Sequence, residues 1–218
     1  AGALSPTPVP TVDDITPTVD QTVSAVPGGW NPAPMGFKFQ WYKVSSGGTT
    51  YTLTGATAGS YLARPSDVGY RLKVTVTGSK TGYKSVSKTS ATTGYVTKAQ
   101  FSIKPTPAIG VDGTVRVGKP LTALPGTYEP VATKYAFKWY RGTTAIVGAT
   151  KATYTPTSSD LGKQVKVRVR AYRSGYATLT QYGDPTSAIA AGLAGLVVPK
   201  LSDSTPVVDQ TIAVANQV

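Results

Sequence analysis

Apolar and polar side chains alternate along several short stretches of this chain. Phe37, Phe39 and Trp41 fall on one face of an extended segment whose intervening residues are polar. The stretches 71–77 and 165–170 alternate in the same way, with leucine or valine on one face and lysine, arginine or threonine on the other. A period of two is typical of strands with one buried face, and neither repeat described below shows a helical period. The pattern predicts an all-β protein of half-buried antiparallel strands.

The chain also repeats itself, with a period of roughly 90 residues. Four pairs of segments match in order: residues 38–43 and 136–141, 55–57 and 148–150, 67–69 and 160–162, and 82–83 and 175–176. The register slips between Lys43 and Gly55, where a Ser-Ser-Gly-Gly turn lengthens the first copy, and surface turns tolerate such insertions. A third copy opens at Thr205–Ile212, which echoes Thr16–Val23.

This repeat divides the chain into three segments: residues 1–97, residues 98–191, and residues 192–218. The linker Gly94–Phe101 is short and is not a Gly/Ser tract, so the first two segments are expected to form a semi-rigid, elongated pair. The last segment supplies only the first strands of a sandwich. It is expected either to add strands to an open sheet edge, of its own module or of a neighbouring chain, or to be a partial third repeat left by proteolysis.

A tryptophan on the third strand, followed by Asp-x-Gly and a valine-rich strand, predicts the fold of each full repeat. This order is typical of an immunoglobulin-like Greek-key β-sandwich, here without a disulfide because the chain has no cysteine. More closely, the chain resembles the Ig-like repeats of secreted surface proteins and wall-active hydrolases of actinobacteria. The matching segments are residues 27–30 and 125–128, 39–42 and 137–140, 55–57 and 148–150, and the Asp-x-Gly and Gly-Tyr pairs. The resemblance implies a spacer or attachment module beside an activity located elsewhere.

Four aromatic residues are predicted to form the cores: Phe39, Trp41, Phe137 and Trp139. Each Trp shares a strand face with its Phe, which favours a core position over a ligand-stacking one. An Ig domain without its inter-sheet disulfide forgoes about 2–5 kcal/mol. Burying one Trp contributes roughly 4–6 kcal/mol at about 25 cal/mol per Å². The Trp clusters can therefore replace the missing bridge.

The residue types that most catalysis requires are missing from the sequence. There is no His and no Cys, which excludes an imidazole base, a thiol nucleophile and the usual zinc sites. Glu129 is the only Glu, and the Asp residues lie mostly in turns or before Gly, so a pair of glycosidase carboxylates is not indicated. Asp13 and Asp14 offer too few oxygen ligands for a calcium cage. The sequence predicts a protein that is not an enzyme and carries no cofactor or metal.

The net charge of +12, from 22 Lys and Arg against 10 acidic residues, favours anionic partners. Wall polymers with phosphate groups and acidic polysaccharides fit this charge, while nucleic acid is disfavoured because no reading motif or base-stacking series is present. A basic surface also simply keeps a protein soluble. No apolar run reaches the roughly 20 residues that span a bilayer. No leader segment is visible, and a Thr-, Gly-, Tyr- and Lys-rich chain is expected to be extracellular, secreted or cell-wall associated.

The candidate binding surface is the outward face of the second repeat, where the third strand and the valine-rich strand should be neighbours in one sheet. Seven residues are predicted to form it: Lys138, Tyr140, Lys163, Lys166, Arg168, Arg170 and Arg173. Such a basic, partly aromatic face suits phosphate or carboxylate polymers. The same cations could instead only solvate an exposed sheet and protect its edges. A weaker version is expected in the first repeat, at Lys38, Tyr42, Arg71 and Lys73.

Three functions follow from these expectations. The leading one is a non-catalytic extracellular stalk or surface-display segment of a larger secreted protein. The second is a cell-wall or polysaccharide-binding module that accompanies a hydrolase. The third is a subunit of a surface filament or layer, in which neighbouring copies of the chain associate by strand addition.

Overall fold

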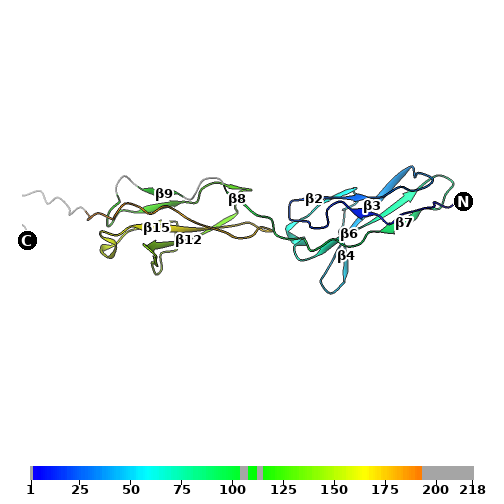
Figure 1. Cartoon of the computed structure of the whole chain (residues 1–218). Coiled ribbons are helices and arrows are strands. Elements are labelled where there is room, and N and C mark those ends of the chain that lie inside the picture. Colours follow the sequence, from blue (N-terminus) through cyan, green and yellow to red (C-terminus); the bar gives the residue numbers. More distant parts are fainter. Residues whose placement is uncertain (1, 104–107, 112–114, 193–218) are drawn as a thin grey trace, which may run out of the picture.

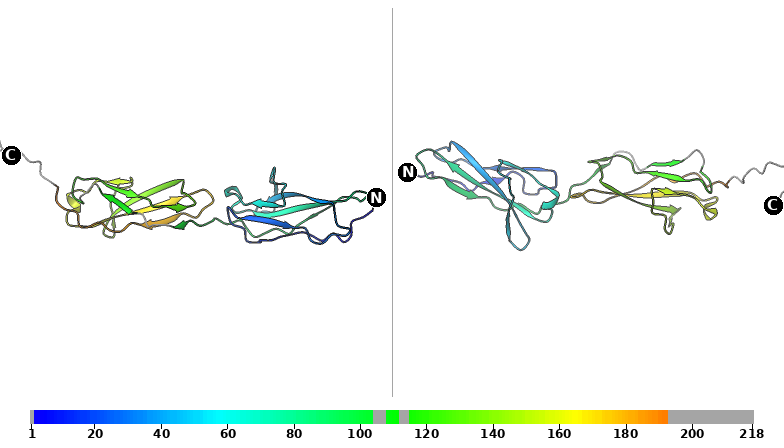
Figure 2. Two further views of the ribbon diagram at one scale, coloured as in Figure 1. Left: turned by 90° about the horizontal axis from the view of Figure 1, so that it is seen from above. Right: turned by 180° about the vertical axis from the view of Figure 1, so that it is seen from behind.

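The computed structural model of the chain describes residues 2–103, 108–111 and 115–192. These residues form β-strands and two single-turn 3₁₀ helices, Pro65–Asp67 and Ser158–Asp160. Neither helix in the described part is long and apolar enough to cross a membrane. Two β-sandwiches lie end to end in an elongated molecule, as Figures 1 and 2 show. Residues 193–218, which hold almost all of the predicted third segment and its first strands, lie outside the described residues.

The first module packs a three-stranded antiparallel sheet on a four-stranded one. The first sheet has the order β1-β2-β5, formed by Thr11–Val12, Thr22–Val26 and Ser60–Leu62. The second has the order β4-β3-β6-β7, formed by Thr50–Thr52, Gly36–Val44, Arg71–Ser79 and Val86–Thr89. Strands distant in sequence are neighbours in both sheets, so the chain crosses between them as in the Ig Greek key.

The second module repeats this arrangement. One sheet has the order β14-β10-β9, formed by Thr153–Tyr154, Leu121–Leu124 and Ala108–Val111. The facing sheet has the order β13-β12-β15-β16, formed by Thr144–Ala145, Lys134–Arg141, Val165–Tyr172 and Leu179–Tyr182. A short two-stranded ladder joins β8 and β11, formed by Ser102–Ile103 and Tyr128–Glu129. The prediction of tandem, all-β, Ig-like sandwiches without disulfides is confirmed.

Trp41 and Trp139 are completely buried, each at the centre of an aromatic and valine-rich cluster. Each indole Nε1 donates to a backbone carbonyl, at 3.0 Å for Trp41 and 2.9 Å for Trp139, so the polar atom of each ring is satisfied. Phe39 and Phe137 are half-buried and pack against the same clusters. The two strand faces that alternation predicts are therefore the core faces.

Trp30 is a further buried residue of the first module, and the second module has no Trp at the equivalent position. Its ring lies against Gly78 of β6, where an added Cβ would come within 2.6 Å of the ring. The equivalent pair in the second module is Tyr128 and Ala171, both buried. The larger ring is thus accommodated by removing a methyl group from the strand beneath it.

Candidate functional site

The four-stranded sheet of the second module carries a row of cations on its outward face. The β12–β15 register pairs Lys138 with Arg168 and Tyr140 with Lys166, and Arg170 lies two positions further along β15. Residues directly opposite each other in an antiparallel pair lie on the same face of the sheet. Five of the seven predicted binding residues therefore form one surface, which we call the basic face: Lys138, Tyr140, Lys166, Arg168 and Arg170.

A sixth residue of the basic face, Tyr182 of β16, was not predicted from the sequence. The rings of Tyr140 and Tyr182 meet edge to face, with centroids 5.8 Å apart. The guanidinium carbon of Arg168 lies 6.0 Å from the Tyr140 centroid, and Lys166 Nζ lies 5.5 Å from the Tyr182 centroid. These cation–π contacts position two flexible cations over rigid rings, so the face alternates charge and aromatic surface.

The other two predicted residues lie away from the basic face, at opposite ends of β15. Lys163 precedes the strand and lines a hollow near the β12–β13 hairpin. Arg173 follows the strand, where its Nη1 donates to Val131 O at 3.0 Å and its guanidinium lies 5.5 Å from the Tyr176 ring centroid. Both residues flank the strand as predicted, and their contacts are with other segments than those of Lys138 and Arg168.

The equivalent face of the first module carries less charge. Tyr42 pairs with Lys73, whose Nζ lies 6.0 Å from the Tyr42 ring centroid, as Tyr140 pairs with Lys166. The positions of Arg168 and Arg170 are taken by threonines. Those two, Thr75 and Thr77, bond hydroxyl to hydroxyl with β7 residues at 2.8 and 2.7 Å. The first module thus keeps Lys38 and Lys73 on this face but has two hydrogen-bonded threonines where the second module has Arg168 and Arg170.

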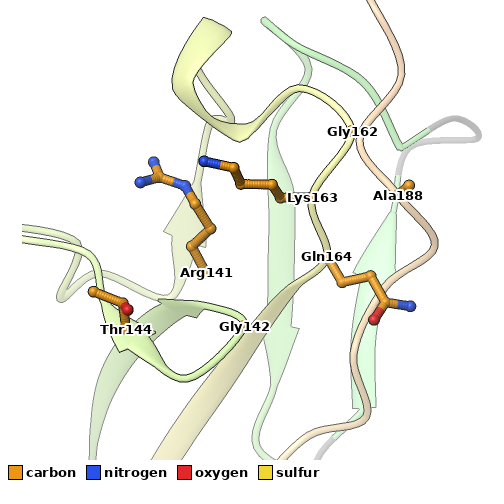
Figure 3. A pocket seen from close by; sticks show the side chains of 7 residues that line it. All are labelled: Arg141, Gly142, Thr144, Gly162, Lys163, Gln164 and Ala188. Carbon is orange, nitrogen blue, oxygen red and sulfur yellow. The ribbon is translucent and has the colours of Figure 1, made fainter.

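The hollow near the β12–β13 hairpin is open and mixed in polarity (Figure 3). The charged ends of Arg141 and Lys163 lie close together in it, but the guanidinium of Arg141 is held by Asp160, with Nε donating to Oδ1 at 2.7 Å. The backbone N–H groups of Gly142 and Gly162 already donate to Gln164 and Ile189 carbonyls. Nowhere in the described residues do three or more His, Cys, Asp or Glu gather as a metal site would require. The Arg141 guanidinium and the two glycine N–H groups are therefore already engaged within the protein.

Each module contains a buried carboxylate, at the equivalent position, that accepts hydrogen bonds from three neighbouring residues. Asp160 accepts from Tyr154 Oη at 2.6 Å, from Thr157 N at 2.8 Å and from Arg141 Nε at 2.7 Å. Asp67 does the same in the first module, with Tyr61 Oη at 2.7 Å, Arg64 N at 3.0 Å and Lys43 Nζ at 3.1 Å. These are structural networks: every oxygen of each carboxylate is used to tie three segments together.

Burial alone would raise the pKa of Asp160, but hydrogen bonds from Tyr154, Thr157 and Arg141 outweigh it and lower the pKa. Burial and the same carboxylate raise the pKa of Tyr154 to about 12. From the sequence, the Asp residues were expected only to lie mostly in turns or before Gly, and this network was not predicted. The available signal was a repeated pattern: a cation two residues after each core Trp, and a Tyr six residues before each Asp.

The junction between the modules is built from backbone pairing on both sides. Thr97 forms a parallel bridge with Thr18 of the first module, and it accepts from Val19 N at 3.0 Å. Ala99 forms a parallel bridge with Tyr176 of the second module. Only one residue separates Thr97 from Ala99, so the linker has no free length in which to swivel.

Side chains seal the same junction. Tyr176 Oη donates to Asp20 Oδ2 at 2.7 Å, across 156 positions of sequence. Burial and this carboxylate raise the pKa of Tyr176. The ring of Phe101, from the linker, packs on Tyr176 with centroids 5.2 Å apart. One apolar cluster therefore contains both Val19 of the first module and Tyr176 of the second.

Comparison with protein-family models finds no match for this sequence, and comparison with curated proteins finds none either. Comparison with solved structures finds chains of similar architecture at low identity. Murine CEACAM1b is 12% identical over 84% of this chain and 98% of that chain, with a TM-score of 0.32. An ICAM-5 ectodomain fragment is 18% identical over 92% of this chain and 55% of that one, with a TM-score of 0.37. A Ca²⁺-stabilized, ice-binding adhesin of an Antarctic bacterium is 13% identical over 85% of this chain and 50% of its own, with a TM-score of 0.36. At these values the likenesses concern the fold alone.

Proposed function

We propose that this chain is a semi-rigid spacer, a non-catalytic two-module segment of a stalk or surface-display region in an exported protein. The observation that carries the proposal is the junction, in which Thr97 and Ala99 are each paired to a different module. A stalk must hold a fixed span, and a flexible linker of the same length would let the modules fold back on one another. The absence of His and Cys supports a role without catalysis. The composition, and the resemblance to actinobacterial surface repeats, support the exported setting.

The variant Tyr176→Ala tests the spacer. It removes both the phenol that donates to Asp20 and the ring that packs on Phe101. We expect both modules to stay folded while the distribution of inter-module distances broadens and the mean maximum dimension falls. Small-angle X-ray scattering measures both quantities, and circular dichroism reports folding.

Tyr83→Ala is the matched control, because Tyr83 occupies the equivalent turn of the first module, away from the junction. It should leave the scattering curve unchanged. A Tyr176→Ala protein that scatters like the parent and the Tyr83 variant would contradict a spacer whose rigidity comes from this contact.

A second function, binding of an anionic wall polymer, is favoured by one specific observation. The basic face presents Lys166 and Arg168 in contact with Tyr182 and Tyr140, so the cations are held in place before any ligand arrives. Preorganised cations beside aromatic rings suit a polymer that carries both phosphate and sugar. A passive spacer needs no such arrangement. The first module keeps a Lys73–Tyr42 contact on this face but has threonines in place of Arg168 and Arg170.

Reversing three charges of the basic face tests this second function. The variant Lys166→Glu, Arg168→Glu, Arg170→Glu should lose about 3- to 150-fold in affinity for a phosphate-bearing wall polymer, since each exposed pair contributes about 0.2–1 kcal/mol. Retention of the parent protein should fall with added salt. The control Lys84→Glu, Lys119→Glu, Lys151→Glu makes the same change of net charge at exposed positions elsewhere. If the polymer retained both variants equally, the binding would depend on net charge alone, and the basic face would not be a specific site.

A further inference from the structure

The modules have the same structure at the end that each presents toward the N-terminus. In the second module this end consists of the turn at Gly175–Tyr176 and the incoming residue Ala99. Ala99 N donates to Gly175 O at 3.0 Å, and Ala177 N donates to Ala99 O at 2.9 Å. We call this end the N-terminal pole of the module, and it is the part that rests on the first module.

The first module builds the same pole with its own incoming segment. Gly2 N donates to Gly82 O at 2.8 Å, and Lys84 N donates to Gly2 O at 3.0 Å, which places Gly2 where Ala99 lies in the second module. Tyr83 forms the parallel bridge with Gly2 that Tyr176 forms with Ala99. Leu4 is buried, as is Phe101 at the matching position. The two poles share backbone pairing, aromatic residue and apolar anchor.

A cation completes both poles. Arg173 donates to Val131 O at 3.0 Å in the second module, and Lys80 donates to Ala33 O at 3.1 Å in the first. At the junction Arg173 lines the same small cavity as Asp20 of the first module, so this cation faces a carboxylate across the contact. The pole of the first module therefore carries the charge that an acidic partner would meet.

The two poles differ in what covers them. A Cβ added at Gly175 would come within 2.8 Å of Val19 and 3.0 Å of Pro65, because the first module is seated there. A Cβ added at Gly82 would meet nothing within 4 Å. Tyr83 is correspondingly half-buried, whereas the exposed fraction of Tyr176 is 9%. The pole of the first module is an uncovered copy of a surface that is covered in the second.

The surface seated on the second module's pole shows which partner chemistry fits. It presents an apolar Val19, the carboxylate of Asp20 and the ring of Pro65. Asp20 has φ 65°, a conformation that costs less for Gly than for Asp, and the equivalent residue of the second module is Gly118. Asp at this position therefore supplies a carboxylate in spite of its backbone cost.

We infer that the N-terminal pole of the first module is a docking surface for another Ig-like module of this repeat type. Its occupant presents a valine, an aspartate and a proline arranged like Val19, Asp20 and Pro65, and its aspartate accepts from the Tyr83 hydroxyl. The inference rests on the proposed spacer function and extends it: the spacer accepts a further module end to end, in the geometry of its own junction.

A chain with residues 1–97 placed once more before Ala1 tests the docking surface. The register is kept, because Gly2 pairs with Gly82 as Ala99 pairs with Gly175, and in the fused chain each follows a residue 97 by two positions. The protein is labelled with fluorotyrosine, and ¹⁹F NMR with a soluble paramagnetic agent reports how accessible each ring is. Tyr→Phe variants assign the resonances of Tyr176 and of both copies of Tyr83.

We call the Tyr83 of the original first module the inner Tyr83, and that of the added copy the outer Tyr83. The inner Tyr83 is expected to become as inaccessible as Tyr176, because the added module covers it. The outer Tyr83 should stay as accessible as Tyr83 in the parent chain. Asp20→Asn in the added copy alone should restore part of the inner ring's accessibility. An inner Tyr83 as accessible as the outer one, with Tyr176 protected, overturns the docking surface and leaves the spacer intact. If Tyr176 is itself fully accessible, the junction and the spacer function both fail. Loss of the resonance dispersion of the inner module on fusion would also count against docking, because the parent chain holds that module folded.

Discussion

Replacing Trp139 by alanine is expected to lower the free energy of unfolding of the second module by about 3–5 kcal/mol. The side chain is completely buried, its Nε1 donates to Lys151 O at 2.9 Å, and its ring packs on Tyr154 with centroids 5.5 Å apart. Alanine leaves a cavity and an unpaired carbonyl in a module that has no disulfide to limit its unfolded state. Urea denaturation followed by circular dichroism measures the loss.

Two variants separate this effect from a general sensitivity of the sheet. Trp139→Phe keeps most of the volume and should cost less than the alanine variant. Tyr182→Ala removes an aromatic side chain that is 48% exposed on the basic face, and it should change stability little. A denaturation midpoint unchanged by Trp139→Ala would remove this residue from the core.

The alternation of side chains predicted the central strands and their buried faces, and the repeat of roughly 90 residues predicted the tandem fold. Alternation works because one face of each strand meets the core, so Val165, Val167 and Val169 alternate with Lys166, Arg168 and Arg170 in the sequence and in space alike. The same rule placed five candidate residues on one face. It could not show where β15 ends, and Lys163 and Arg173 lie beyond its two ends.

Contacts between distant segments were beyond the reach of local pattern. The Tyr176–Asp20 bond depends on how two modules meet, and no periodicity within one repeat contains that information. Tyr182 joins Tyr140 only through the register of β16 on β15, which the turn before β16 sets. The Asp160 network has the same cause, since its partners come from β12 and β14.

The variant Asp160→Ala is expected to destabilise the second module by about 3 kcal/mol or more, near the range for breaking a buried ion pair. The Asp160 side chain is 0% exposed and that of Arg141 is 27% exposed, so part of the guanidinium can still be solvated. The loss also frees Tyr154 Oη and Thr157 N, which then lack their acceptor. Asp160→Asn keeps the shape and removes the charge, so it should fall between the parent and the alanine variant.

The same network predicts how the free energy of unfolding depends on pH. Stability should rise with pH in the acidic range, where Asp160 ionises, and fall with pH in the alkaline range, where Tyr154 ionises. The pKa of Asp160 is lowered in the folded protein, so its contribution is complete above the ordinary value of 3.8 and is lost as pH falls below it toward the folded pKa. The pKa of Tyr154 is raised to about 12, so its contribution is complete below 10.0 and is lost as pH rises toward 12. Denaturation midpoints from pH 2 to 12 should therefore fall at both extremes in the parent, and less steeply at each in Asp160→Asn. Equal slopes in the two proteins would show that Asp160 is not the group whose ionisation is coupled to folding.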